Sequence, residues 1–286
     1  MTEQLRLGHR LVSLKASMVC HSGLQQLPLF YNLTMSGSNP DYNSNPNPVR
    51  AVILLSGGLD STTMLAMAAA RSRHIYALSF SYHQRHQAEL EYATRQARRY
   101  HAIRHEILDL EPWGRILAPA TALVQNSKLA VPQVSPPSGS TQSDKIPVTY
   151  VPARNTLFLS VALGFAEVVE AQEIWIGVNA VDYSGYPDCR PSFVDAFERL
   201  ANLATKRAIE GQPFVIESPL IGLGKHEIIQ KGLALGVQYQ DTLSCYHPSM
   251  DTADATKIKA CGRCDSCSLR LEGFARAGAT DPLEYM

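Results

Sequence analysis

The stretch AVILLSGGLDSTTML, from Ala51 to Leu65, constrains the fold of this chain more than any other. Five apolar residues run into Ser-Gly-Gly and then into Asp60 and three hydroxyl residues. An apolar run of this length is typical of a strand buried on both faces, and the residues after Asp60 have a helical pattern. The stretch therefore predicts a strand, a glycine-rich turn and a helix, which begin a parallel α/β sheet.

Strands and helices continue to alternate along the chain. The apolar periodicity predicts strands over residues 51–55, 74–82, 104–110 and 173–179, and helices over residues 61–71, 87–100, 155–171 and 195–210. Asn155 is placed to cap the third of these helices. Such alternation is typical of βαβ units, so we expect a doubly wound α/β fold with a mainly parallel sheet.

The composition divides the chain into three parts. With 286 residues, 45% of them hydrophobic, the chain can bury a sizeable core. Residues 1–48 have weak periodicity and end in a cluster of Ser, Asn, Pro and Gly, so we expect a poorly ordered extension. Residues 49–240 form the predicted α/β domain, with an irregular loop over residues 125–148. Residues 241–286 form a small cysteine-containing region that we expect to pack on this domain.

The charge balance argues against two classes of partner. Lys plus Arg and Asp plus Glu each number 26, so zero net charge gives no general attraction to nucleic acid or to an anionic membrane. The chain has no apolar run near the roughly 20 residues that a membrane helix needs. We therefore expect a cytoplasmic protein that binds neither nucleic acid nor membranes.

The SGGLDS loop, residues 56–61, has the features of an anion site. Ligands collect where parallel strands end, and the amides at the start of the next helix point there. The glycines allow close approach of the backbone, and Ser56 and Ser61 offer hydroxyl groups. The loop matches neither G-x-x-x-x-G-K-[ST] nor G-x-G-x-x-G. Because Asp60 would repel a bare phosphate, we expect it to hold Mg²⁺ that bridges phosphates.

Four cysteines near the C-terminus form a C-x15-C-x2-C-x2-C array: Cys245, Cys261, Cys264 and Cys267. Four thiolates at this spacing suit one tetrahedral Zn²⁺ with a structural role. Disulfides, an iron–sulfur cluster or a redox-active pair are the alternatives. His247 is close enough in sequence to compete as a ligand.

Two further stretches follow predicted strand ends or open predicted helices. DYSGYPDCRPSF, residues 182–193, follows the strand at 173–179, and YVPARNTLFLS places Arg154 and Asn155 at the same edge of the sheet. An arginine there can bind a phosphate or carboxylate through two hydrogen bonds. Arg85 and His86 in HQRH fit either phosphate binding or helix entry. Lys225 lies near a helix start, where it could approach ATP, but a solvated surface residue is the simpler interpretation.

These motifs carry a resemblance. S-G-G-x-D-S after an apolar strand looks like the PP-loop of the ATP pyrophosphatase superfamily. Together with ALSFSYHQRH, VPARNTLFLSVAL, IGVNAVDYSGYPDCRPSF, SPLIGLGKHEII, TLSCY and CGRCDSCSLRLEGFARAGATDP, it resembles the 7-cyano-7-deazaguanine synthase family, in order from Ala51 to Pro282. The family usually has Gly where His83 and Ala153 stand here, which raises a question about the backbone at both positions.

The resemblance implies an ATP-dependent ligase of queuosine precursor biosynthesis, acting on small molecules as a homodimer. It would activate the carboxylate and then the amide of 7-carboxy-7-deazaguanine, with ammonia, to make 7-cyano-7-deazaguanine. Its cofactors would be ATP, Mg²⁺ and one structural Zn²⁺.

The resemblance also implies roles for individual residues. The expected catalytic residues are Asp60, Ser61, Arg154, Asp182 and Asp188. The expected ATP site comprises Leu55, Ser56, Gly57, Gly58, Leu59, Asp60, Ser61, Thr62, Thr63, Ala77, Leu78, Ser79 and Phe80. The expected substrate site comprises Arg154, Asn155, Tyr183, Tyr186, Asp188 and Arg190.

Two other functions fit part of the sequence. A PP-loop enzyme that adenylates and thiolates tRNA would also combine SGGxDS with Cys-x-x-Cys, but it should carry a basic surface. From Asp251 onward the chain has five Lys or Arg against six Asp or Glu. A zinc-dependent interaction module would leave the SGGLDS loop unexplained.

Overall fold

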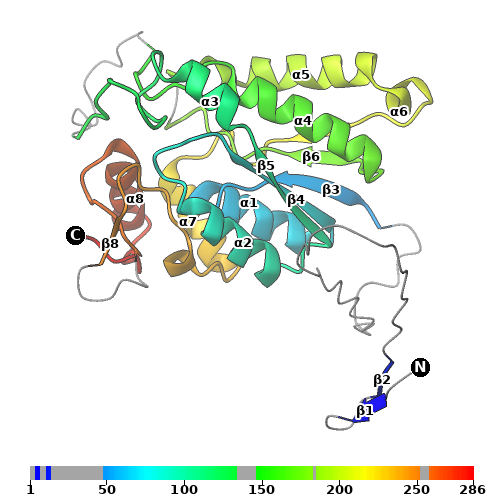
Figure 1. The fold of residues 1–286 in the computed structure, drawn as a ribbon, viewed down its shortest axis with the longest axis horizontal. Helices are drawn as coiled ribbons and strands as arrows, with labels where there is room; N and C mark the ends of the chain where they lie inside the picture. Colours follow the sequence, from blue (N-terminus) through cyan, green and yellow to red (C-terminus); the bar gives the residue numbers. More distant parts are fainter. Residues whose placement is uncertain (1–3, 7–10, 14–47, 134–145, 183–184, 252–257) are drawn as a thin grey trace, which may run out of the picture. The chain divides into compact units, whose positions relative to one another are not determined.

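The computed structural model describes residues 4–6, 11–13, 48–133, 146–182, 185–251 and 258–286 (Figure 1). The chain divides into two units, Met1–Tyr42 and Asn43–Met286. In the first unit, β1 (Gln4–Arg6) and β2 (Leu11–Ser13) pair antiparallel. The rest of the expected extension up to residue 47, and positions 134–145 of the expected irregular loop, lie outside the described residues.

The second unit is built on a parallel sheet of five strands in the order β5-β4-β3-β6-β7. Every neighbouring pair in this sheet runs parallel. The strands are β3 (Arg50–Leu54), β4 (His74–Ser81), β5 (Arg104–Asp109), β6 (Glu173–Trp175) and β7 (Val215–Glu217). The predicted doubly wound α/β fold is confirmed.

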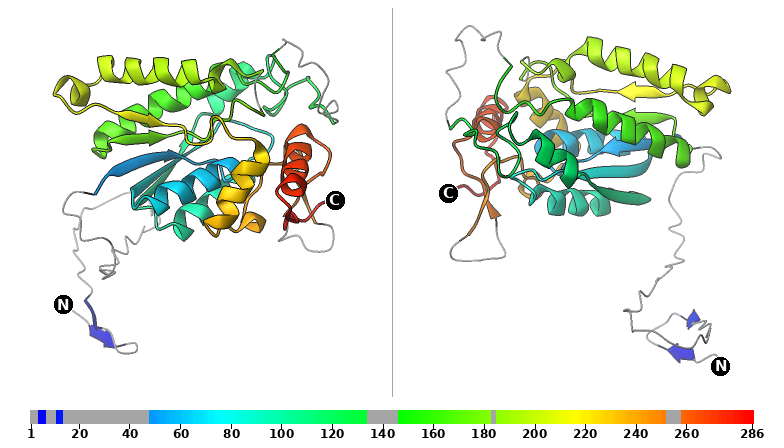
Figure 2. Two further views of the ribbon diagram at one scale, coloured as in Figure 1. Left: turned by 180° about the vertical axis from the view of Figure 1, so that it is seen from behind. Right: turned by 45° about the horizontal axis from the view of Figure 1, so that its top comes forward.

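Helices cover both faces of this sheet (Figures 1 and 2). One face carries α1 (Leu59–Ala70), α2 (Glu89–Arg99) and α7 (Lys225–Ala234). The other face carries α4 (Arg154–Val168) and α5 (Pro191–Ala204), while the short α3 (Glu111–Leu117) follows β5. This arrangement follows from right-handed crossovers that leave the central strand β3 in opposite directions.

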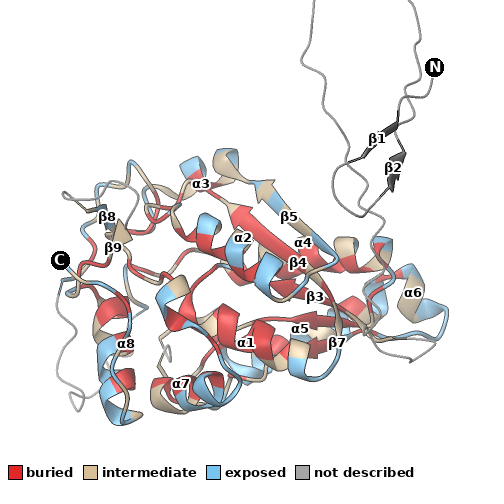
Figure 3. Cartoon of the chain, turned by 90° about the horizontal axis from the view of Figure 1, so that it is seen from below, coloured by how far each residue is buried: buried red, intermediate tan, exposed pale blue. Residues whose placement is uncertain are grey.

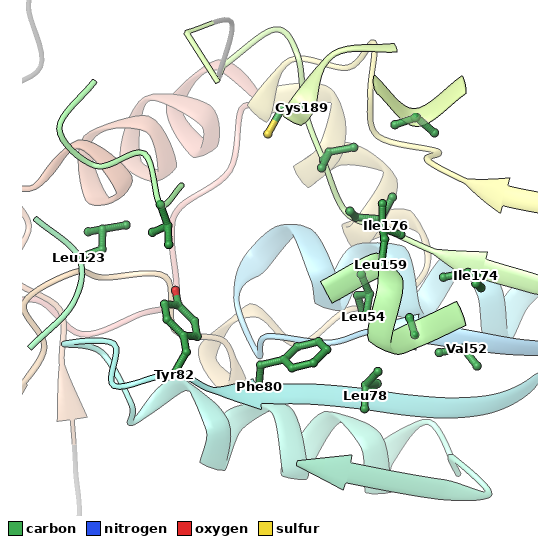
Figure 4. Packing of buried hydrophobic residues seen from close by; sticks show 14 of the residues in the cluster. Val52, Leu54, Leu78, Phe80, Tyr82, Leu123, Leu159, Ile174, Ile176 and Cys189 are labelled. Carbon is green, nitrogen blue, oxygen red and sulfur yellow. The ribbon is translucent and has the colours of Figure 1, made fainter. Parts of the chain in front are cut away.

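Strand β3 shows why the chain needs two covered faces. Ala51, Val52 and Ile53 have no exposed surface, and successive side chains of a strand point to opposite faces. Val52 belongs to the cluster under α4 that includes Leu159, while Ile53 belongs to the cluster with α1 and α7 (Figure 4). Figure 3 shows the central strands β3 and β4 as largely buried, while the edge strand β5 and the outer faces of the helices are partly exposed.

Three predicted element boundaries are wrong. The helix expected over 195–210 is two helices, α5 and α6 (Lys206–Ile209), because Thr205 between them has extended backbone and turns its hydroxyl back to the Ala201 carbonyl at 2.8 Å. The strand expected over 173–179 pairs only over β6. Asn155 does not cap α4, because the helix begins at Arg154 and Ala153 is the cap residue.

The C-terminal part contains β8 (Ser249–Met250), β9 (Ile258–Lys259) and α8 (Asp265–Arg276). Helix α8 packs against α7 at Gly273, where an added Cβ would lie 2.5 Å from Cγ of Lys225. Arg270 of α8 is 2% exposed and donates two hydrogen bonds to Asp281 and one to the Thr242 hydroxyl. Across the described residues, no helix has both the length and the apolar character that a membrane crossing requires.

His83 and Ala153 both have left-handed backbone, with φ of 64° and 55°. These are the two positions where the resemblance led us to expect glycine. A non-glycine residue pays about 1 to 2 kcal/mol in this region, because its Cβ approaches the neighbouring carbonyl oxygen. The chain therefore keeps a glycine-type backbone conformation at both places without the glycine.

Replacing Ala153 with glycine is expected to stabilise the protein by about 0.5 kcal/mol. The gain is smaller than the strain relieved, because glycine also raises the entropy of the unfolded chain. The matched control is Ala196→Gly at an exposed position inside α5, where the backbone is helical and a loss of about 1 kcal/mol is expected. Urea denaturation measures both, and a loss of stability in Ala153→Gly would contradict the strain argument.

Candidate active site and metal centre

The main pocket lies where the strand order reverses. The chain leaves β3 towards β4 and enters β6 on the other side, so the carboxyl ends of β3 and β6 flank a crevice of the kind that binds ligands in open α/β sheets. The pocket is lined by the SGGLDS loop after β3, by Ile176 to Asn179 after β6, and by the start of α4. Figure 4 shows four residues that line it: Phe80 of β4, Tyr82 just after β4, Ile176 just after β6, and Cys189 from the short turn Pro187–Cys189.

The SGGLDS loop is held closely against its neighbours. Gly57 has φ of 86°, and an added Cβ would lie 2.3 Å from the Glu89 carbonyl oxygen, so only glycine fits. The Ser61 hydroxyl accepts from the Ser56 amide at 3.2 Å and donates to the Gly58 carbonyl at 3.2 Å. The loop is thus preorganised at the start of α1, where helix amides favour an anion.

The predicted ATP residues fall into two groups. Those lining the pocket are Leu55, Ser56, Gly58, Leu59, Asp60, Ser61, Leu78 and Phe80, and those outside its lining are Gly57, Thr62, Thr63, Ala77 and Ser79. The Thr63 hydroxyl donates to the Leu59 carbonyl at 2.9 Å, and the Ser79 hydroxyl bonds the Leu55 carbonyl and His105. The side chains of the second group therefore belong to the packing beneath the loop.

Lys225 is not the surface residue that the sequence indicated. It is 7% exposed, and its Nζ donates to both Asp60 oxygens at 2.7 Å. The same Nζ lies 3.5 Å from Oδ2 of Asp182, which also accepts from Asn179 at 2.7 Å. One buried ammonium thus joins the two carboxylates that follow β3 and β6.

The pKa of Asp182 reflects this arrangement. Burial raises the pKa above its ordinary value, the Lys225 ammonium lowers it, and the Asp60 charge raises it again. Asp60 lines the pocket while Asp182 does not. The signal in the sequence was Asp60 itself, because a carboxylate placed at the end of a buried strand needs a cation as its partner.

Arg154 and its neighbours form the opposite wall. The positive charge of Arg154 lowers the pKa of the buried Tyr82 hydroxyl and of the Cys189 thiol, against the effect of burial. The Arg154 Nε donates a hydrogen bond to Asn155 at 3.3 Å. Instead of capping α4, the Asn155 side chain donates to the Asp188 carbonyl at 2.9 Å and to Cys189 at 3.7 Å. The burial of Cys189 raises the pKa of its thiol to about 11.

The remaining predicted substrate residues are placed unequally. Tyr186 lines the pocket and its hydroxyl bonds that of Thr149 at 2.5 Å. Asp188 lies behind the lining, where its Oδ2 accepts from the Asn155 amide at 3.2 Å. Arg190 is exposed and precedes α5, away from the pocket lining. Tyr183 lies outside the described residues.

Sequence reasoning missed several pocket residues. Phe158 of α4 stacks on Phe80, with ring centroids 3.9 Å apart and planes 9° from parallel. His86 and Glu89, just before and in α2, are 6% and 8% exposed and face each other at 3.4 Å. The pocket is also lined by Tyr82, Asn179, Ser244, Tyr246, Ser266 and Arg270. The sequence had offered His86 for phosphate binding or helix entry, but nothing in the polar stretch HQRHQAELEY singled out Glu89 or its pairing with His86.

The four cysteines of the C-terminal array form one buried cluster. Their sulfur atoms all lie within 4.8 Å of one another. The backbone amides of His247 and Cys261 donate to the Cys245 sulfur at 3.3 and 3.2 Å, and the Cys264 amide donates to the Cys261 sulfur at 3.4 Å. Amide donors of this kind stabilise thiolate charge. The cluster can hold one metal ion, and the cysteines in the described part of the chain form no disulfide.

Comparison with known proteins identifies the family. The family model described as "Queuosine biosynthesis protein QueC" matches residues 50–278, which span the whole sheet, the pocket and the cysteine cluster. The chain belongs to the QueC family. The match begins at β3 and so leaves out the N-terminal unit of this QueC family member.

This QueC family member matches curated relatives over nearly the full length of each relative. The 7-cyano-7-deazaguanine synthase of Pseudomonas syringae pv. tomato is 56% identical over 82% of this chain and 97% of the relative. Those of Pseudomonas paraeruginosa and Citrifermentans bemidjiense are also 56% identical, over 84% and 82% of this chain and 99% and 97% of the relatives. Solved structures are more distant: NMN synthetase from Francisella tularensis, 14% identical over 70% of this chain and 66% of its own, has a TM-score of 0.40, too low to carry an argument.

In this QueC family member the cysteine cluster is tied directly to the SGGLDS loop. The segment before Cys245 donates from the Leu243 amide to the Gly57 carbonyl at 3.0 Å. The next residue, Ser244, accepts at its hydroxyl from the Leu59 amide at 3.1 Å. Tyr246 follows Cys245, lines the pocket and lies 5.7 Å from His86 between ring centroids. The cysteine array thus anchors one wall of the pocket.

Proposed function

We propose that this chain converts 7-carboxy-7-deazaguanine, ammonia and ATP to 7-cyano-7-deazaguanine, a queuosine precursor. The observation that carries the proposal is that one pocket is lined by both the SGGLDS loop and Arg154. A site for phosphate and a guanidinium that can bind a carboxylate therefore share one crevice. Membership of the QueC family supports the same reaction.

At the nucleotide end, the SGGLDS loop would hold the phosphates of ATP. Ser56 and Ser61 offer hydroxyl groups, and the start of α1 offers backbone amides. Lys225 adds a positive charge next to Asp60. Carboxylate oxygens are the ligands that Mg²⁺ takes in proteins, so Asp60, which lines the pocket, would hold it through the oxygen lone pairs that Lys225 leaves open, and the ion would neutralise phosphate charge.

At the purine end, Arg154 would bind the 7-carboxylate through paired hydrogen bonds. The stacked rings of Phe80 and Phe158 offer an apolar surface for a flat heterocycle. Because Asp188 lies behind the lining and holds Asn155, it would act as a positioning residue. Tyr186, fixed by Thr149, would close this side of the pocket.

The proposed reaction activates the same carbon twice. A carboxylate oxygen is a poor leaving group, so it would first attack ATP to form an acyl adenylate, from which ammonia gives the amide. The amide oxygen would then be activated in the same way, and its loss with the nucleotide would leave the C≡N bond. The amides and hydroxyls of the SGGLDS loop would stabilise the charge that develops on the phosphate in each half.

For the cysteine cluster we propose one structural Zn²⁺ held by Cys245, Cys261, Cys264 and Cys267. Zinc–sulfur bonds of about 2.3 Å place the corners of a tetrahedron about 3.8 Å apart. The Cys261 and Cys267 sulfurs are 3.9 Å apart, and the full set lies within 4.8 Å. A space of this size supports a single ion over an iron–sulfur cluster. The homodimer and the cytoplasmic location stay predictions.

The proposal is tested by incubating the purified chain with ATP, Mg²⁺, ammonium and 7-carboxy-7-deazaguanine and separating the products by mass-resolved chromatography. The nitrile is expected from the wild type. Asp60→Ala is expected to lower the rate of nitrile formation by at least about 100-fold, because the variant lacks the carboxylate that would hold Mg²⁺ at the phosphates. ATP consumption that needs tRNA and leaves the free purine unchanged would favour the tRNA-modifying alternative.

A further inference from the structure

The proposed reaction must remove every proton from the nitrogen atom of ammonium. The inference drawn from this requirement rests on the proposed function. Ammonium carries four hydrogens, while the nitrile nitrogen carries none. Four protons must therefore leave the same nitrogen atom, two before the amide is complete and two during nitrile formation. General bases reach such protons only at hydrogen-bond distance or through one water.

Most ionisable groups in the pocket lining are poor acceptors of these protons. Asp60 is engaged at both oxygens by the Lys225 ammonium. Cys189 is a thiol with a pKa of about 11, and burial also raises the pKa of the Tyr82 and Tyr186 hydroxyls. Arg154, Lys225 and Arg270 are cations. Tyr246 offers only a phenol hydroxyl. Within the described lining, Glu89 is then the remaining carboxylate and His86 the imidazole.

Glu89 and His86 form a buried carboxylate–imidazole pair. Oε1 of Glu89 lies 3.4 Å from Nε2 of His86 and accepts from Gln84 at 3.5 Å. Among the described residues, His86 is the only ion-pair partner of Glu89, and the His86 Nδ1 is buried without a hydrogen-bond partner. If Nε2 donates to Glu89, Nδ1 is an acceptor, which matches the N–H groups of ammonium.

The pair lines the same pocket as Arg154 and Tyr82. The pKa of the buried Tyr82 hydroxyl is raised by burial and by the Glu89 charge and lowered by the Arg154 guanidinium. The Tyr246 ring packs against the His86 ring, and the neutral Gln84 side chain donates a hydrogen bond to Glu89. Glu91 and Arg95 on α2 pair with each other at the surface. A small cation at Glu89 and a carboxylate bound at Arg154 would thus share one pocket.

We propose that Glu89 and His86 bind ammonium and accept the protons that its nitrogen loses. Glu89 takes a proton from ammonium, and the lone pair of the resulting ammonia forms the C–N bond. The C–O bond to the nucleotide breaks with its electron pair, and a second proton passes to the pair. After the amide oxygen is activated, two further protons follow the same route while the second C–O bond breaks, and the pair returns each proton to water.

The test separates carboxylate activation from ammonia use. Hydroxylamine, which is uncharged at neutral pH, traps the activated carboxylate as a hydroxamate without prior proton removal. Glu89→Gln is expected to keep hydroxamate formation within about threefold of the wild type, while nitrile formation from ammonium falls at least about 100-fold and the KM for ammonium rises. His86→Asn is expected to show the same pattern with a smaller loss, about tenfold.

The matched control is Glu91→Gln, which removes an exposed carboxylate from the same helix and should leave both products unchanged. Equal loss of hydroxamate and nitrile in Glu89→Gln would overturn the inference, because it would assign Glu89 to activation or to folding. Unchanged nitrile formation would overturn it as well. A wild type that makes neither product would instead refute the proposed function, and this inference would fall with it.

Discussion

Replacing Lys225 with methionine is expected to destabilise the protein by about 3 to 5 kcal/mol and to abolish measurable nitrile formation. The change leaves Asp60 and Asp182 close together without the ammonium that now lies 2.7 and 3.5 Å from them. Removing one partner of a buried ionic group is costly because the remaining charges are desolvated and unpaired. Methionine keeps most of the volume, so the loss reports the charge and not a cavity.

The effect is expected to depend on pH. Burial already raises the pKa of Asp182, and Lys225 lowers it, so the variant should have a still higher pKa in the folded state. A carboxyl with a raised folded pKa gives stability at low pH that is lost as the pH rises from its unfolded value, about 3.9, through the folded one. The gap between Lys225→Met and the wild type should therefore widen above about pH 4.

Urea denaturation at several pH values measures this gap, with Lys231→Met as the control. Lys231 is exposed on the same helix, and its replacement should change the stability by less than about 0.5 kcal/mol. A Lys225→Met protein as stable as this control at pH 8 would show that the ion pair is not buried as described.

Replacing Cys264 with serine is expected to remove the metal ion that we propose for the cysteine cluster and, with it, the activity. Structural zinc in small peptides contributes about 10 to 16 kcal/mol of apparent folding free energy, which is comparable with the stability of a whole domain. The region after Leu243 should therefore open locally. Because Ser244 and Tyr246 flank Cys245, the SGGLDS loop would lose the contact at the Leu59 amide, and nitrile formation should fall by more than about 100-fold.

Metal analysis, limited proteolysis and the product assay test this expectation together. The variant should hold less than about a tenth of the metal of the wild type and be cleaved first between Leu243 and α8. Ser268→Ala, on the same helix, should behave as the wild type. A metal-free protein with normal activity would show that the cysteine cluster does not support the pocket.

Features set by neighbours in sequence could be predicted from the sequence. The SGGLDS loop lies between its strand and its helix, and the cysteines converge in one cluster, because both patterns are local. The positions of His83 and Ala153 were also informative, since the glycine that the resemblance led us to expect there pointed to the left-handed backbone found here.

Features set by packing between distant segments could not be predicted in this way. Lys225 meets Asp60 across 165 residues, and nothing near Lys225 distinguishes it from a surface lysine. Asn155 looked like a helix cap, yet its amide is bound by Asp188, 33 residues away. The Gly57 contact with α2 and the Ser244 contact with Leu59 depend on the same long-range packing.

The most direct test of the central claim follows the oxygen atoms of the substrate. With 7-carboxy-7-deazaguanine labelled with ¹⁸O in both carboxylate oxygens, each activation should transfer one labelled oxygen to the nucleotide. We predict two ¹⁸O-labelled nucleotide monophosphates for every nitrile formed, detected by mass spectrometry. A nitrile accompanied by unlabelled nucleotide would contradict the double adenylation, and ATP consumption without any nitrile would contradict the proposed reaction in this pocket.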